Sequence, residues 1–202
     1  MVVKILALAG SLRKDSYNKK LVKVAAEGAR AAGAEVTVID MKDFPLPVYD
    51  GDEEATKGLP DNAKKLKKIF LEHQALLIAS PEYNSSIPGG LKNLIDWVSR
   101  PETKEEPDLA CFRGKAAAIM SASPGGLGGM RMLVPLRLML GNIGVLVLPG
   151  QVAVSRAHEA FDAGGVLKDA KQDAAVRALA AELVKVAGKL TRPAQQDLLS
   201  GA

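Results

Sequence analysis

The chain of 202 residues has little of several residue types that mark particular protein classes. Cys111 is its single cysteine, which excludes an intramolecular disulfide framework and fits a reducing cytoplasm. Aromatic residues make up only 4% of the chain, which leaves little for nucleic-acid bases to stack on. No apolar run approaches the roughly 20 residues of a membrane span. We therefore expect a cytoplasmic protein that binds neither nucleic acid nor membrane.

The charged residues, the two histidines, Cys111 and the first residues of the chain also bear on which functions are possible. The formal net charge is +4, and the basic residues are scattered apart from KKLKK at 64–68, which we interpret as the solvated face of a helix. We expect His73 at a helix end and His158 on the surface; the alternative is that His158 reaches a neighbouring subunit's site. Cys111 is expected to be a small buried hydrophobe rather than a catalytic thiol. The start MVVKILALAG lacks a small-residue cleavage site, which predicts no signal peptide.

What the sequence does contain is an alternation of short runs rich in Val, Ile, Leu and Ala with longer segments of helical periodicity. The predicted strands are 2–9, 35–40, 75–80, 115–121 and 145–148. The predicted helices are 17–32, 61–72, 88–99, 128–141 and 168–190. Right-handed crossovers between parallel strands then give an α/β domain of three layers, with helices on both faces of the sheet.

The remaining segments set the domain boundaries. Pro135 conflicts with an uninterrupted helix, so we expect a kink or a late helix start there. The stretches 43–50 and 149–165 are too short to be domains and are predicted to be loops that cover an edge or a partner surface. We expect one domain over 1–190 and a frayed tail over 191–202. Such a sheet binds ligands at the carboxyl ends of its strands.

The first loop to consider is GSLRKDSYNKK, residues 10–20, between the first predicted strand and a helix. Gly10 is its only glycine, so neither the dinucleotide fingerprint GxGxxG nor the P-loop GxxxxGK[ST] is present. The donors of this turn are helix-start amides and the side chains of Ser11, Arg13, Ser16 and Asn18. Such a donor-rich turn suits a terminal phosphate. The alternative is that Asp15 or Ser16 only caps the helix and Arg13 lies on the surface.

Two more loops follow the third and fourth predicted strands. PEYNSSIPGG, residues 81–90, contains Pro88 at a position where the first turn of a helix tolerates proline. We predict that Glu82, Tyr83 and Asn84 face a flat heterocycle, whereas the core face of the next helix consists of Leu91, Leu94, Ile95 and Trp97. SPGGLGGMR, residues 123–131, contains four glycines, which allow close backbone approach to a ligand or, alternatively, only a flexible connection.

These motifs, in this order and spacing, resemble those of the NADPH-dependent FMN reductase family, a flavodoxin-like group that includes bacterial quinone and chromate reductases. The resemblance covers roughly residues 2–148 and implies strand order 2-1-3-4-5. It implies an FMN phosphate bound at Ser11, Arg13, Ser16, Tyr17 and Asn18. It implies an isoalloxazine lined by Pro81, Glu82, Tyr83 and Asn84, with Ser121, Ser123, Gly125 and Gly126 on the other side. It also implies a homodimer or homotetramer with the flavin near a subunit interface.

The resemblance further implies an activity. NADPH or NADH would reduce FMN, and a quinone, chromate, an azo compound or free flavin would then take the hydride in a ping-pong cycle. No catalytic side chain and no metal is expected, because the flavin performs the chemistry. One rival is a flavodoxin-type electron carrier without NAD(P)H turnover, although such carriers tend to be acidic. A second rival is a regulatory or scaffold protein that has lost the flavin.

Overall fold

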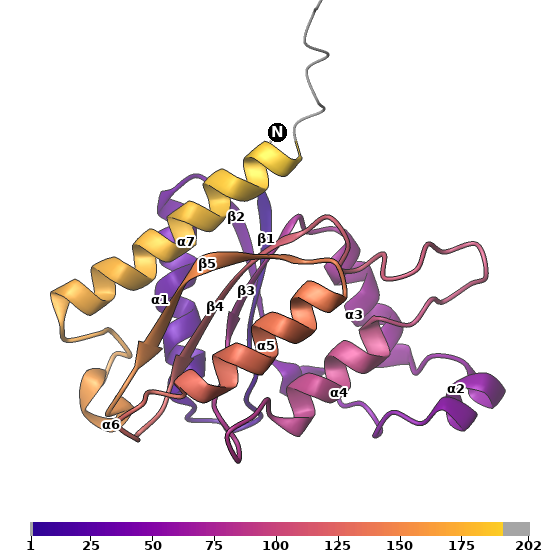
Figure 1. Ribbon diagram of the computed structural model, residues 1–202, viewed down its shortest axis with the longest axis horizontal. Coiled ribbons are helices and arrows are strands. Elements are labelled where there is room, and N and C mark those ends of the chain that lie inside the picture. The colour runs from indigo at the N-terminus through magenta and orange to yellow at the C-terminus, as the bar shows by residue number, and fades with distance from the viewer. Residues whose placement is uncertain (1, 192–202) are drawn as a thin grey trace, which may run out of the picture.

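Five parallel strands form one sheet in the computed structural model, which describes residues 2–191 (Figure 1). The strands are β1 (Lys4–Ala9), β2 (Glu35–Ile39), β3 (Ala75–Ala79), β4 (Ala116–Ala122) and β5 (Leu146–Val154). Their order is β2-β1-β3-β4-β5. The predicted three-layer α/β fold and its strand order are therefore confirmed. The predicted frayed tail lies outside the described residues except for Thr191.

Helices cover both faces of the sheet because successive strand residues point to opposite sides. Ile5 and Ala7 of β1 lie in the core beneath α1 (Tyr17–Ala31) and α7 (Ala170–Leu190). Leu6 and Leu8 lie in the opposite core. That second core is covered by α3 (Asp61–Leu71), α4 (Gly89–Val98) and α5 (Met130–Asn142). Among residues 2–191, no helix has the length and apolar character that crossing a membrane requires.

The contact between α1 and α7 depends on a glycine. A Cβ atom at Gly28 would lie 2.7 Å from the Cα of Arg177, so the two backbones approach too closely for a larger residue. The two helices lie side by side in Figure 1. This contact allows the last part of α1 to pack closely against α7.

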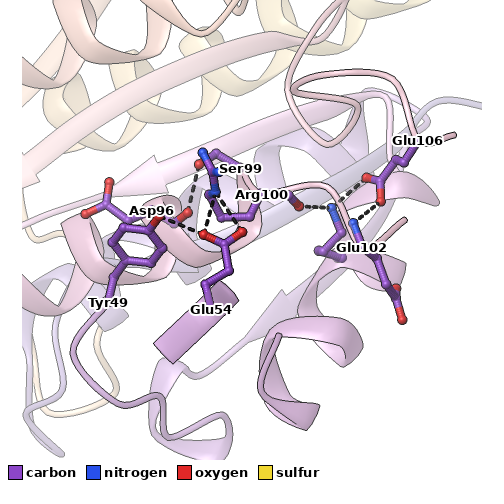
Figure 2. Close-up of polar contacts among 8 residues, drawn as sticks. Tyr49, Glu54, Asp96, Ser99, Arg100, Glu102 and Glu106 are labelled. Carbon is purple, nitrogen blue, oxygen red and sulfur yellow. Dashed lines mark hydrogen bonds and ion pairs between the residues drawn. The ribbon is translucent and has the colours of Figure 1, made fainter. Parts of the chain in front are cut away.

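Residues 44–59, which we call the α2 arm, extend from the end of the sheet and contain a helix that the sequence did not predict, α2 (Gly51–Lys57). Tyr49 Oη donates a 2.8 Å hydrogen bond to Glu54, and Arg100 Nε donates to both oxygens of Glu54 at 2.9 and 3.0 Å (Figure 2). Trp97 of α4 is buried, as predicted, and its Nε1 donates to the Pro47 carbonyl at 2.8 Å. The arm is thus fastened to α4 and the turn that follows it.

Strand β5 is longer than predicted. The sequence predicted a strand over 145–148 and a loop from 149, but β5 continues to Val154. Ala117 of β4 pairs with Val147 of β5, but Ile119 pairs with Gln151, so a step of two positions along β4 corresponds to a step of four along β5. The ladder is therefore interrupted rather than ended. Arg137 of α5 donates to the Leu148 carbonyl at 2.6 Å and to the Gln151 side chain at 3.0 Å across this irregularity. Pro149 and Gly150 are typical of a loop, but here they lie in a bulge.

Helix α5 also differs from the prediction. It begins at Met130, two residues after the predicted start, and continues through Pro135 to Asn142. The expected late start after Pro135 is therefore wrong, and the kink stays a prediction. Gly129 precedes the helix with φ 84°, and the Arg131 amide donates to Glu82 at 3.2 Å. Because this carboxylate satisfies a helix-start amide, α5 begins before the proline.

Candidate functional site

The carboxyl ends of β1, β3 and β4 are adjacent in the sheet, and the loops that follow them meet there. We call this region the carboxyl edge; its first loop is 10–16, its second 80–88 and its third 123–129. Gly10 joins the first two loops: its amide donates to the Ala79 carbonyl at 2.8 Å. A Cβ atom at Gly10 would lie 2.5 Å from Ser80 Oγ, so only glycine fits between these strands.

The first loop presents a set of donors. Ser11 and Ser16 are buried, whereas Arg13 is exposed. Ser16 is the N-cap of α1 and accepts the Asn18 amide at 3.2 Å, so the predicted capping role is present. Within the described part of the chain, several amides of this turn donate to no other protein group, among them those of Leu12, Lys14, Asp15 and Tyr17. Free amides, a helix N-terminus and a guanidinium suit a phosphate group.

Asn18 has a role that sequence reasoning missed. Its side chain is buried, donates to the Ala122 carbonyl at 2.8 Å and accepts the Ala122 amide at 2.9 Å. Both polar groups of Asn18 are thereby used to hold the start of α1 against the end of β4. The neighbouring Tyr17 ring stacks on Phe161, with ring centroids 6.2 Å apart. Asn18 therefore positions the first loop relative to the third.

The second loop exposes an aromatic ring to solvent. Tyr83 and Ser86 exchange backbone hydrogen bonds of 3.1 and 3.0 Å around a two-residue turn. Asn84 and Ser85 within it have φ of 50° and 63°, the left-handed conformations that a type I′ turn requires. Such backbone conformations are costly without glycine and occur often at binding sites. The Tyr83 side chain is 46% exposed at this rigid turn.

Glu82 is held by the helix that follows the third loop. Arg131 Nε donates to its carboxylate at 2.7 Å, and the Arg131 amide donates at 3.2 Å. The Glu82 side chain is only 8% exposed, whereas that of Arg131 is 59% exposed. The sequence singled out Glu82 as a residue that lines the heterocycle, but gave no signal of this partner. The ion pair fixes the second loop against the start of α5.

The third loop makes a tight turn at the carboxyl edge. Ser121 is buried and its hydroxyl donates to the Gly128 carbonyl. Gly128 and Gly129 have φ of 61° and 84°. A Cβ atom at Gly129 would lie 2.0 Å from Ser121 Oγ, so this glycine is required for close packing. A Cβ atom at Gly126 would meet nothing within 4 Å, so the loop leaves open space at its tip.

Elsewhere in the described residues, ionisable groups offer no catalytic constellation. Burial raises the pKa of the Cys111 thiol, which opposes thiolate formation. His73 is buried between the Ile69 carbonyl (2.6 Å) and Thr37 (2.8 Å), a structural bridge. His158 lies on the surface, 3.2 Å from Glu159. No group of three or more potential metal ligands is found within residues 2–191. Cys111 and His73 precede β4 and β3, at the other end of the strands from the carboxyl edge, which remains the candidate site.

The residues at this edge fit a flavin mononucleotide. The first loop supplies unpaired amides and a guanidinium for one phosphate, and the second supplies an exposed aromatic ring on a rigid turn. The third supplies small residues and open space at Gly126. Flavin mononucleotide has one phosphate group joined to a flat ring system, and these three loops offer contacts suited to both parts.

Known proteins are similar to this chain over most of its length. Residues 3–159 match the protein family described as NADPH-dependent FMN reductase. The chain is 40% identical over 170 residues to an NAD(P)H-dependent FMN reductase of Pseudomonas aeruginosa, covering 84% of this chain and 86% of that protein. It is 37% identical over 198 residues to an NAD(P)H:quinone oxidoreductase of Solanum tuberosum, covering 94% and 95%. The solved structure of FerB, a flavoenzyme NAD(P)H:(acceptor) oxidoreductase from Paracoccus denitrificans, superimposes with a TM-score of 0.78 at 30% identity, covering 93% and 98%.

Proposed function

The chain belongs to the NADPH-dependent FMN reductase family, and from this premise we propose that it binds FMN and uses NADPH or NADH to reduce quinones or similar small acceptors. The observation that carries the proposal is the meeting of the donor-rich first loop and the Tyr83 turn at one edge of the sheet. The Solanum tuberosum relative is named for quinone reduction, which supports a quinone as the acceptor. Residues 1–190 act as one FMN-binding domain in this proposal.

In this proposal, the residues of the chain bind and orient FMN. The amides of the first loop, with Ser11, Arg13, Ser16 and Tyr17, hold the phosphate, while Asn18 keeps that loop against β4. Pro81, Glu82, Tyr83 and Asn84 would line one side of the isoalloxazine, and Ser121, Ser123, Gly125 and Gly126 would line the other. The chemistry that FMN supplies when bound is hydride acceptance and donation. Backbone amides of the second loop are dipoles that stabilise negative charge developing at the ring.

One open face serves both substrates in this proposal. In the proposed ping-pong order, NAD(P)H would bind and leave before the acceptor binds at the same place, and FMN, when bound, would supply the hydride chemistry between them. An open face discriminates poorly among acceptors, so chromate, azo compounds and free flavin are also proposed acceptors. We propose that the protein acts in the cytoplasm as a homodimer or homotetramer; light scattering of the purified protein measures this assembly.

The first experiment is a visible spectrum of protein reconstituted with FMN and desalted, before and after anaerobic addition of NADPH. We expect retained yellow colour that bleaches and returns when a quinone is added. Colour that is retained but does not bleach would favour a flavodoxin-type carrier. Colourless protein would contradict the assignment of the first loop.

A second experiment tests the phosphate site. Arg13→Ala combined with Ser16→Ala should weaken FMN binding at least about tenfold, because charge-assisted donors to the phosphate are removed. Ser16 is also a helix cap, so Asp169→Ala is the matched control: Asp169 caps α7 by accepting the Lys171 amide at 2.9 Å. Loss of that cap alone should leave the affinity unchanged. Undiminished FMN affinity in the double variant would remove the phosphate-site argument.

A further inference from the structure

A cavity of about 610 Å³ lies beside the first loop, between α1 and the carboxyl end of β2. It is lined by Lys14, Asp15 and Ser16 of that loop, by residues of α1 and β2, and by Gly164 and Gly165. We call it the lysine cavity. Its volume is within the range of cavities that bind small molecules, roughly 300–1,000 Å³. Because β2 is the neighbour of β1, the cavity adjoins the proposed phosphate site.

Four lysines and three aspartates line this cavity. Lys19 forms an ion pair with Asp40. Partial burial acts to raise the pKa of Asp40, but the hydrogen bonds from Lys19 and from the Lys42 amide lower it overall, so Asp40 remains a carboxylate. The charge of Lys19 is therefore already compensated within the protein, and the other lysines remain for a ligand.

The other three lysines have no carboxylate partner. Across residues 2–191, no ion pair involves Lys14, Lys20 or Lys23. Lys20 is half-buried, and its Nζ lies 5.9 and 6.0 Å from the ring centroids of Tyr17 and Phe161. Two stacked rings thus hold this ammonium beside the cavity. A positioned cation without a protein anion suits an anionic ligand.

The rest of the lining fits a nucleoside better than a simple anion. Val22, Val38 and Ile39 offer apolar surface for a base. The exposed carboxylates of Asp15 and Asp43 are acceptors for ribose hydroxyls and an exocyclic amine. Lys14, Asp15 and Ser16 belong both to the first loop and to the cavity lining, so a ligand in the cavity would lie beside the proposed phosphate site.

We propose that the lysine cavity binds the adenosine 2′-phosphate end of NADPH, through Lys20 and Lys23, and thereby favours NADPH over NADH. This inference rests on the proposed function, since the nicotinamide must reach the carboxyl edge at the same time. Lys20 and Lys23 lie three positions apart on α1, on one face of the helix. NADH has a hydroxyl group in place of the 2′-phosphate and gains nothing from these two charges.

The first test uses FMN-loaded enzyme with a quinone acceptor and compares kcat/KM for NADPH with kcat/KM for NADH. The double variant Lys20→Met and Lys23→Met keeps the apolar stems and removes the charges. We expect the NADPH to NADH ratio to fall at least about tenfold, as expected for lost charged contacts to a phosphate. The matched control is Lys64→Met with Lys65→Met, two exposed lysines on α3. This control should leave the ratio unchanged, and an unchanged ratio in the Lys20 and Lys23 variant would overturn the proposal.

The second test does not depend on turnover. Calorimetry should show that adenosine 2′,5′-bisphosphate binds the FMN-loaded protein at least about tenfold more tightly than adenosine 5′-monophosphate, and that the double variant loses this difference. Equal binding of the two nucleotides by the wild-type protein, or an unchanged difference in the double variant, would overturn the proposal. If NADPH is not oxidised at all but the bisphosphate still binds selectively, the proposed function fails and the lysine cavity stands.

Discussion

Two regions of the molecule are fastened by the same kind of ion pair. At the carboxyl edge, Arg131 donates to Glu82 at 2.7 Å, and in the α2 arm Arg100 donates to Glu54 at 2.9 and 3.0 Å. In both pairs the carboxylate is well covered, 8% and 15% exposed, and the arginine is much more exposed. The first pair holds a strained turn that carries an exposed tyrosine, whereas the second joins α2 to the turn that follows α4. Two ion pairs of similar geometry thus have different roles: one positions a loop of the candidate site, and the other attaches the α2 arm. Their positions in the fold account for the difference.

The largest effect is expected from a substitution that disrupts the packing of the carboxyl edge. Gly129→Ala would force a Cβ atom against Ser121 at a left-handed position. We expect the free energy of unfolding to fall by roughly 1–3 kcal/mol from overpacking, and FMN retention to be lost. Urea denaturation and desalting after FMN loading measure both. Gly51→Ala in the α2 arm is the control: its Cβ would make an ordinary contact of 3.8 Å with Tyr49 Oη, and both quantities should be unchanged.

The two ion pairs are compared directly by Glu82→Gln and Glu54→Gln. Each variant keeps the size of the side chain and removes one charge, so we expect each to lower the free energy of unfolding by about 1 kcal/mol or less. Only Glu82→Gln should weaken FMN binding, by about tenfold, because only its partner holds the second loop. Fluorescence titration with FMN measures the difference. Equal FMN affinities in the two variants would show that the Glu82 pair is also only an attachment.

The α2 arm should loosen at alkaline pH. The hydrogen bond to Glu54 and, next, burial raise the pKa of Tyr49 above its ordinary value of 10.0. Because the folded-state pKa is the higher one, this stabilisation is fully present below pH 10.0 and is lost as the pH rises through the folded-state pKa. The Tyr49 ring lies edge-on to Trp97, the only tryptophan, with centroids 5.0 Å apart. Trp97 fluorescence should therefore change above pH 10.0, and Tyr49→Phe should abolish that change.

The smallest expected effect concerns acid stability beside the lysine cavity. The folded-state pKa of Asp40 is lowered, so the Lys19 pair stabilises the fold above the ordinary pKa of 3.8 and this contribution is lost as the pH falls through the folded-state value. The pair is partly exposed, so we expect less than about 1 kcal/mol from it. Asp40→Asn should flatten the acid limb of stability against pH, measured by circular dichroism. An acid limb as steep as that of the wild-type protein would contradict this contribution.

The sequence predicted the sheet and its loops because those features have local causes. Buried parallel strands are continuous apolar runs, and Pro81, Pro88 and the third-loop glycines mark where the chain turns. It missed α2 because that helix buries no residue and so shows no apolar periodicity. It missed the Asn18 contacts with Ala122, 104 residues away in the chain, and the partner of Glu82, 49 residues away. Neither long-range pairing leaves a local pattern.

The bulge in β5 has a consequence for association. β5 lies at one margin of the sheet, where unpaired strands of other molecules add most easily. Here the ladder is interrupted between Val147 and Gln151, Pro149 offers no amide, and Arg137 already occupies the Leu148 carbonyl. A strand of another molecule therefore lacks a regular series of backbone donors and acceptors to pair with along this stretch. The arrangement therefore opposes the addition of a further strand at this margin of the sheet.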